Sequence, residues 1–198
     1  ISVKSVYNFV LYVRNKYQLL KPFDTRSFNQ VEELPYGAQA QVDFGEYNMT
    51  DAYGIRKKVY FFALVLSRSR YKFVMFSDHP FTTESAIADH ERAFAHIDGY
   101  PGELVYDQDT LLLVSENKGN LSLTHAFRAY HQSRPFKFHF CRKSDPQSKG
   151  KIENVIKYIK YNFLRGRIYY DIYTLNAQAL EWLERTANAK EHSTTRKI

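Results

Sequence analysis

Alternating and continuous runs of apolar residues predict three consecutive strands in the first half of the chain. From Ala38 to Glu46 apolar and polar residues alternate, so that Asp43 falls on the polar side of a strand otherwise suited to burial. The run from Val59 to Leu66 is apolar throughout, which is typical of a central strand covered on both faces. A short polar turn then leads to a third strand from Tyr71 to Phe76. The short connections predict that these strands form an antiparallel meander.

After Pro80 the spacing of apolar residues predicts helices that alternate with short strands. The first helical stripe, from Ala86 to Ile97, includes His90, so we interpret His90 as a core histidine rather than a ligand. The segment from Glu103 to Asp107 follows as a short strand. Because a helix leads to it, we expect it to lie parallel to an earlier strand. The remaining predicted elements are helices at 122–132, 152–163 and 174–189, a minor strand at 111–114 and a strand at 136–140.

These elements predict an α/β fold with a mixed five-stranded sheet and flanking helices. Three strands followed by alternating helices and strands is the order of the ribonuclease H-like fold. We expect this fold to occupy residues 38–170, and residues 171–198 to form a C-terminal helix and tail. Residues 1–37 are expected to hold a helix and a proline-containing linker. The helix is either a remnant of an upstream DNA-binding region or a simple amphipathic linker.

Positive charge gathers on the predicted helix near residue 150. Residues 142–167 contain eight Lys or Arg against two acids, and so hold six of the chain's net charge of +7. At about 100° per residue, Glu153 lies at the edge of the apolar stripe, among lysines. The pI of about 9.3 favours a polyanionic partner, nucleic acid before an anionic membrane surface, the alternative being a merely basic soluble protein. No apolar run approaches the roughly 20 residues of a membrane span, so we expect no membrane partner.

Six cations on or next to this helix are candidates for contacts to DNA phosphates. They are Lys149, Lys151, Lys157, Lys160, Arg142 and Lys143. Contacts of this kind hold the DNA backbone without reading its sequence. Lys151 is less well placed than the other lysines, because it falls on the side of the helix away from Glu153. The alternative interpretation of the whole set is a solvated basic face.

Three acids, Asp43, Asp107 and Glu153, are candidates for a metal site. In the predicted fold the strands with Asp43 and Asp107 are neighbours, and the helix with Glu153 crosses the edge of the sheet near both. Carboxylates that converge repel one another unless a cation neutralises them, and Mg²⁺ binds carboxylates together with substrate phosphates and water. Two such ions can activate a water or a 3′-hydroxyl for phosphoryl transfer.

The sequence also allows other interpretations of each acid. Any of them could be a cap or a solvated side chain, and Asp109 competes with Asp107 for the second position. Glu153 could be only an i,i+4 partner of Lys157. The single cysteine, Cys141, excludes an internal disulfide and a cysteine-based zinc site, and we expect it to be a buried small residue.

Three sequence blocks resemble the catalytic blocks of bacterial insertion-sequence transposases of the IstA type, in the DDE superfamily that includes retroviral integrases. They are QVDFGE at 41–46, VYDQD at 105–109 and SDPQSKGKIEN at 144–154. The resemblance implies that Asp43, Asp107 and Glu153 bind two Mg²⁺ ions, for which Mn²⁺ can substitute. It further implies that this DNA transposase site cleaves the 3′ ends of the element and joins them to target DNA.

The same resemblance implies partners and further domains. They are an upstream helix-turn-helix region, a small C-terminal β domain that we expect to be missing here, an AAA+ ATPase helper protein and a homo-oligomer on DNA. We expect an internal fragment of a longer bacterial protein, cytoplasmic and associated with the nucleoid. His192 lies in a matching segment, and the sequence indicates no role for it. Two other functions stay open, a ribonuclease H-like nuclease without strand transfer and a non-catalytic DNA-binding module.

Overall fold

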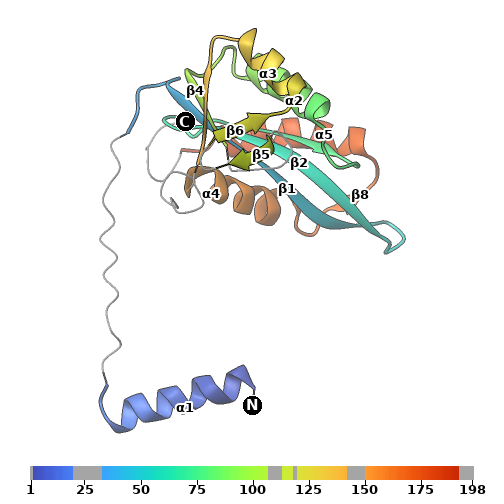
Figure 1. Cartoon of the computed structure of the whole chain (residues 1–198). Coiled ribbons are helices and arrows are strands. Elements are labelled where there is room, and N and C mark those ends of the chain that lie inside the picture. Colours follow the sequence, from blue (N-terminus) through green and yellow to red (C-terminus); the bar gives the residue numbers. More distant parts are fainter. Residues whose placement is uncertain (1, 20–32, 107–112, 118–119, 142–149, 192–198) are drawn as a thin grey trace. The chain divides into compact units, whose positions relative to one another are not determined.

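Figure 1 shows the protein as a computed structural model, which describes residues 2–19, 33–106, 113–117, 120–141 and 150–191. The chain divides into two compact units, residues 1–32 and 33–198. The first unit contains the helix α1, Val3–Lys16, in agreement with the amphipathic helix predicted there. Ser2 caps its start, since the Ser2 side chain accepts a hydrogen bond from the Ser5 N–H.

A mixed sheet forms the centre of the second unit (Figure 1). Five of its strands follow the order β3-β2-β1-β4-β7. β1, β2 and β3 are antiparallel neighbours, whereas β4 runs parallel to both β1 and β7. The strands span Gln39–Asp51 (β1), Arg56–Leu66 (β2), Lys72–Ser77 (β3), Glu103–Tyr106 (β4) and Lys137–Phe140 (β7). The predicted meander and mixed sheet are therefore confirmed, although the sheet has six strands instead of five. A short strand that was not predicted, β8 at Ile168–Tyr169, pairs with the far end of β1.

Helices cover both faces of this sheet. They span Thr83–His96 (α2), His125–Gln132 (α3), Gly150–Tyr158 (α4) and Ile172–Trp182 (α5), and the last two continue as wider π-helical turns, Ile159–Leu164 (η2) and Leu183–Ala187 (η3). On β2, the Phe62 ring contacts His90 of α2. Its neighbour Phe61 contacts Phe76, which stacks on Phe163 of η2. Because adjacent strand residues point to opposite faces, α2 and η2 lie on opposite sides of the sheet.

A separate hairpin lies between β4 and α3 in the sequence. Its strands, β5 at Leu113–Asn117 and β6 at Asn120–Leu123, pair antiparallel. The helix predicted from residue 122 therefore starts later, at His125, because strand pairing overrides the helical spacing of the preceding apolar residues. Thr124 caps the helix, with its side-chain oxygen accepting a hydrogen bond from the Phe127 N–H.

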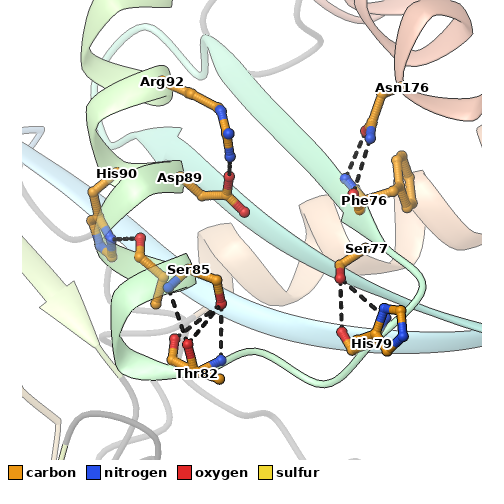
Figure 2. Close-up of polar contacts among 10 residues, drawn as sticks. Phe76, Ser77, His79, Thr82, Ser85, Asp89, His90, Arg92 and Asn176 are labelled. Atoms are coloured by element: carbon orange, nitrogen blue, oxygen red, sulfur yellow. Dashed lines mark hydrogen bonds and ion pairs between the residues drawn. The ribbon is translucent and has the colours of Figure 1, made fainter. Parts of the chain in front are cut away.

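Two asparagine side chains cover the outer edge of β3. Asn176 of α5 accepts a hydrogen bond from the Phe76 N–H (2.8 Å) and donates one to the Phe76 carbonyl oxygen (2.9 Å), as Figure 2 shows. Asn188 makes the same pair of bonds with the backbone of Lys72, both at 2.9 Å. Each amide thus takes the place that a residue of a further strand would occupy along this edge.

Gly45 leaves the space that the Phe61 ring fills across the β1–β2 pair. A Cβ at position 45 would lie 2.2 Å from Cζ of Phe61, and the fully buried ring has no room to move away. We expect Gly45→Ala to lower the free energy of unfolding by about 1–3 kcal/mol, measured by denaturant titration. The control is Gly150→Ala, where an added Cβ meets nothing within 4 Å, so we expect no loss. An equally harmless Gly45→Ala would contradict the argument.

Candidate active site

Asp43 of β1 and Glu153 of α4 line the same cavity. The cavity encloses about 320 Å³, part of it open solvent, and its walls come from β1, β4 and α4. The other residues that line it are Gln41, Val42, Val105, Tyr106 and Ile152. Asp43 is half-buried and Glu153 is exposed, so both carboxylates belong to a site that water and solutes can reach. The structure therefore brings together two of the three predicted acids.

The third predicted acid, Asp107, and its competitor Asp109 lie outside the described residues. The parallel pairing of β1 with β4 runs as far as Val42 opposite Tyr106. Tyr106 is the last residue of β4 and lines the cavity. The described residues alone contain no group of three His, Cys, Asp or Glu placed to hold a metal ion.

Gln41 connects the strand of Asp43 to the helix of Glu153. It lies two residues before Asp43, on the same side of β1, and its side chain is buried in the cavity wall. Its Oε1 accepts a hydrogen bond of 3.0 Å from the N–H of Ile152, the third residue of α4. An N–H in the first turn of a helix has no partner within that helix, so Gln41 supplies one. This bond anchors α4 to β1 one residue before Glu153.

Sequence reasoning did not identify Gln41, although a signal was present. Gln41 is a polar residue on a strand suited to burial, and the alternation of β1 puts it on the same side as Asp43. A buried amide of this kind needs a hydrogen-bond partner. That partner lies 111 positions later in the chain, and its identity depends on the tertiary fold.

A histidine and a tyrosine are joined behind the cavity wall. The Nδ1 of His90 lies 2.7 Å from the Ala86 carbonyl oxygen and its Nε2 lies 2.8 Å from the Tyr106 hydroxyl (Figure 2 shows the first of these bonds). Because a carbonyl can only accept, Nδ1 donates to it, and the neutral ring accepts from Tyr106 through Nε2. Burial lowers the pKa of His90 to about 4, which keeps it neutral. The interpretation of His90 as a core histidine is confirmed.

The predicted DNA-binding cations occupy different environments. Lys157 is exposed, and the ammonium group of Lys160 lies 5.9 Å from the centre of the Phe61 ring. Lys151 forms an ion pair with Glu33, with 3.5 Å between Nζ and Oε2. The other three, Arg142, Lys143 and Lys149, lie outside the described residues, as does His192. Cys141 is buried, as expected. Within the part of the chain that the structure describes, no helix combines the length and apolarity needed to cross a membrane.

The chain is similar to curated transposases along most of its length. It is 50% identical over 198 residues to the transposase for an IS21-like insertion sequence element of Bacteroides fragilis, which covers 98% of this chain and 38% of that relative. It is 29% identical over 154 residues to the transposase for insertion sequence element IS21 of Pseudomonas aeruginosa, which covers 77% of this chain and 39% of that relative. The resemblance to insertion-sequence transposases inferred from the three sequence blocks is confirmed. The chain spans about two fifths of the length of these relatives.

Solved structures show the fold independently. The catalytic core domain of HTLV-2 integrase in complex with magnesium, in its dimeric form, matches with a TM-score of 0.57 at 16% sequence identity. The match covers 78% of this chain and 91% of that domain. The fold is therefore ribonuclease H-like, of the retroviral integrase core type. No protein-family model matches the chain.

If Gln41 anchors α4, removal of its acceptor oxygen should loosen the first turn of that helix. We expect Gln41→Met to speed hydrogen exchange of the Ile152 amide and to lower the free energy of unfolding by about 1–2 kcal/mol. The matched control is Gln39→Met on the same strand. Gln39 bonds to Ser67 and Glu103 instead of α4, so this change should leave exchange at Ile152 unchanged. Unaltered exchange at Ile152 in Gln41→Met would show that the bond is not an anchor.

The buried, neutral His90 should make stability depend on pH. Its pKa of about 4 in the folded protein lies below the value of about 6.5 in an unfolded chain, so unfolding takes up a proton between these values. Stability should therefore fall by up to about 3 kcal/mol as pH drops from 6.5 to 4. The negative charge of Glu91 opposes the effect of burial on the pKa.

The measurement is the free energy of unfolding of His90→Gln and of the unchanged protein across this pH range. Gln keeps an amide donor and acceptor but does not titrate, so its curve should be flatter. Since His96 and His131 also have pKa values lowered by burial, only the difference between the two curves reports on His90. Parallel curves would contradict the prediction.

Proposed function

We propose that this chain is the catalytic core of a DDE transposase. It would cleave phosphodiester bonds at the 3′ ends of a mobile element and join the resulting 3′-hydroxyls to target DNA. The observation that carries the proposal is the cavity shared by Asp43 and Glu153, two acids from the resembling sequence blocks that lie on different elements. The transposases to which the chain is similar support the same conclusion.

Asp107 is proposed as the third acid on the basis of strand register. Val42 pairs with Tyr106 across the parallel strands, and the residues that follow them in the sequence are Asp43 and Asp107. Equivalent positions on neighbouring parallel strands point to the same side of a sheet. This register favours Asp107 over Asp109, which lies two residues further from the last paired position.

The proposed cofactor is Mg²⁺, bound as two ions by Asp43, Asp107 and Glu153, with Mn²⁺ able to substitute. Carboxylate oxygens at an accessible cavity are the donors that Mg²⁺ prefers, and the similar HTLV-2 integrase core was solved with magnesium. When bound, the ions supply charge neutralisation and activation of the attacking hydroxyl. Asp43 holds its place on a paired strand, and Gln41 holds the helix turn that presents Glu153.

DNA is the proposed substrate, with the phosphate backbone held by cations beside the acids. Lys157 and Lys160 follow Glu153 on α4 and η2, and Arg142, Lys143, Lys149 and Lys151 precede it in the sequence. Six basic groups around one acid attract a polyanion and offset the repulsion between DNA phosphates and the carboxylates. Affinity from such contacts is independent of base sequence.

Further domains and partners follow from the same proposal. Residues 1–37 would belong to an upstream DNA-binding region, 38–170 would form the catalytic domain, and 171–198 would lead to a C-terminal domain. An AAA+ ATPase would assist target selection, and the protein would act as a homo-oligomer on DNA in the bacterial cytoplasm, associated with the nucleoid. The dimeric form of the similar integrase core supports self-association.

The test is a Mg²⁺-dependent cleavage and joining assay with the full-length protein and linear DNA that carries the element ends. We expect Asp43→Asn, Asp107→Asn and Glu153→Gln each to reduce both steps at least about a hundredfold, because each removes a metal ligand, while DNA affinity stays close to that of the unchanged protein. The control is Glu84→Gln on the exposed first turn of α2, which should keep full activity.

Three outcomes would count against the proposal. Undiminished cleavage by Asp43→Asn or Glu153→Gln would remove that residue from the site. Cleavage without joining by the unchanged protein would favour a nuclease. Tight DNA binding with neither step, together with no Mn²⁺ binding in a titration, would favour a non-catalytic DNA-binding module.

A further inference from the structure

Two cations hold one carboxylate next to the first turn of α4. Glu33, which precedes β1, places Oε1 2.5 Å from one terminal nitrogen of Arg70 and Oε2 3.4 Å from the other. The Lys151 ammonium lies 3.5 Å from the same Oε2. The side chains are only 11% (Arg70), 24% (Glu33) and 26% (Lys151) exposed, so this contact is more sheltered than a typical surface ion pair.

Positive charge outweighs negative charge in this cluster. Arg68, two residues before Arg70 in the β2–β3 turn, adds a third cation, whose guanidinium lies over the Tyr36 ring at 5.6 Å. Burial and the charges of Arg70 and Arg68 lower the pKa of Lys151, while Glu33 raises it, which is the behaviour of cations close enough to repel one another. Within residues 33–106 and 150–191, Glu33 is the carboxylate that pairs with Arg70 and Lys151. An anion at this position therefore offsets the repulsion between the cations.

The backbone at Arg70 gives a second indication that its charge is needed there. Arg70 has a φ of +65°, in the left-handed region that Gly or Asn adopts at lower cost. An arginine at such a position is strained relative to one with a relaxed backbone. The turn thus contains an arginine with a strained backbone, and the guanidinium of this arginine forms a bidentate contact with a carboxylate. Arginine forks bind phosphate in the same two-pronged manner.

We propose that Arg68, Arg70 and Lys151 form a binding site for a DNA phosphate, and that Glu33 occupies this site when DNA is absent. The proposal rests on the proposed function in taking DNA as the ligand. A phosphodiester carries one negative charge and two free oxygens, as a carboxylate does. It can therefore replace the Glu33 carboxylate at the two terminal nitrogens of the Arg70 guanidinium. Lys151 is adjacent to Ile152, which lines the proposed catalytic cavity, and its side chain leaves α4 on the side away from Glu153. DNA bound here would therefore lie beside that cavity.

Displacement of Glu33 has a consequence for the chain before β1. Glu33 and Tyr36 are the two contacts by which residues 33–37 meet these cations in the described structure. When a phosphate takes the place of the carboxylate, the Glu33 contact is lost and the start of this segment is released. The same exchange makes Glu33 a competitor of DNA, so its removal should strengthen DNA binding.

The test measures binding of a fluorescent DNA duplex of arbitrary sequence to the full-length protein, over a range of salt concentrations and with EDTA present. We expect Glu33→Gln to raise the affinity about threefold to tenfold, because no internal anion competes. We expect Arg70→Gln to lower the affinity and to reduce the slope of log affinity against log salt concentration by about one. The matched control is Glu181→Gln, which removes the same charge from an exposed ion pair with Arg185 on another part of the surface.

The double variant Glu33→Gln/Arg70→Gln separates competition from a general effect of charge. If Glu33 acts by occupying the Arg70 fork, the gain from Glu33→Gln should disappear when Arg70 is already replaced. Thermal unfolding of every variant shows whether it is folded, and Lys151→Gln replaces Arg70→Gln should the latter fail to fold.

Three results would overturn the inference. They are an equal gain in Glu33→Gln and Glu181→Gln, an unchanged affinity in Arg70→Gln, and a gain from Glu33→Gln that persists in the double variant. The assay contains no free divalent metal and needs no reaction, so these results do not depend on whether Asp43 and Glu153 support cleavage. If the unchanged protein does not bind DNA, both this inference and the proposed function are overturned.

Discussion

The position of α4 on β1 is the constraint on which the rest of the site depends. Glu153 is exposed and lines the cavity of Asp43, and the first turn of its helix is tied to the strand through Gln41 and Ile152. The buried stripe of the helix, with Ile152 and Val155, holds the same arrangement through apolar contacts, but such contacts tolerate small shifts. The hydrogen bond is directional, and it fixes the register between helix and strand.

The charged side chains around the candidate site come from elements that are far apart in the sequence. The acids project from β1 and α4, while the cations come from the β2–β3 turn, α4 and η2. Such a surface attracts a polyanion, and its sheltered cations are stabilised by a counterion when the polyanion is absent. Glu33 provides one for Arg70 and Lys151. Under the proposed competition between Glu33 and a DNA phosphate, DNA affinity would depend on this ion pair as well as on the contacts to DNA.

The sequence predicted most of the fold because the apolar pattern of the main strands and helices is dictated by burial. The alternation of β1 and the apolar run of β2 identified the centre of the sheet, and the stripe of α2 correctly placed His90 in the core. The pattern did not predict β8, whose two residues are defined by pairing with β1, or β6, which is defined by pairing with β5. In the site, Asp43 and Glu153 were predicted, whereas the bonds of Gln41 and Glu33 were not. Gln41 bonds to a residue 111 positions away, and Glu33 pairs with residues 37 and 118 positions away, so both sets of bonds depend on the tertiary fold.

The asparagine pair along β3 limits how copies of this protein can meet. An unpaired edge strand can form hydrogen bonds with a strand of a second chain and so extend the sheet. In β3, the backbone groups of Phe76 and Lys72 that such pairing would use already bond to Asn176 and Asn188. Pairing of a second chain with β3 would require that these side-chain bonds break first. In the proposed assembly of several copies on DNA, this protection would disfavour continuous β-sheet between neighbouring copies across the β3 edge.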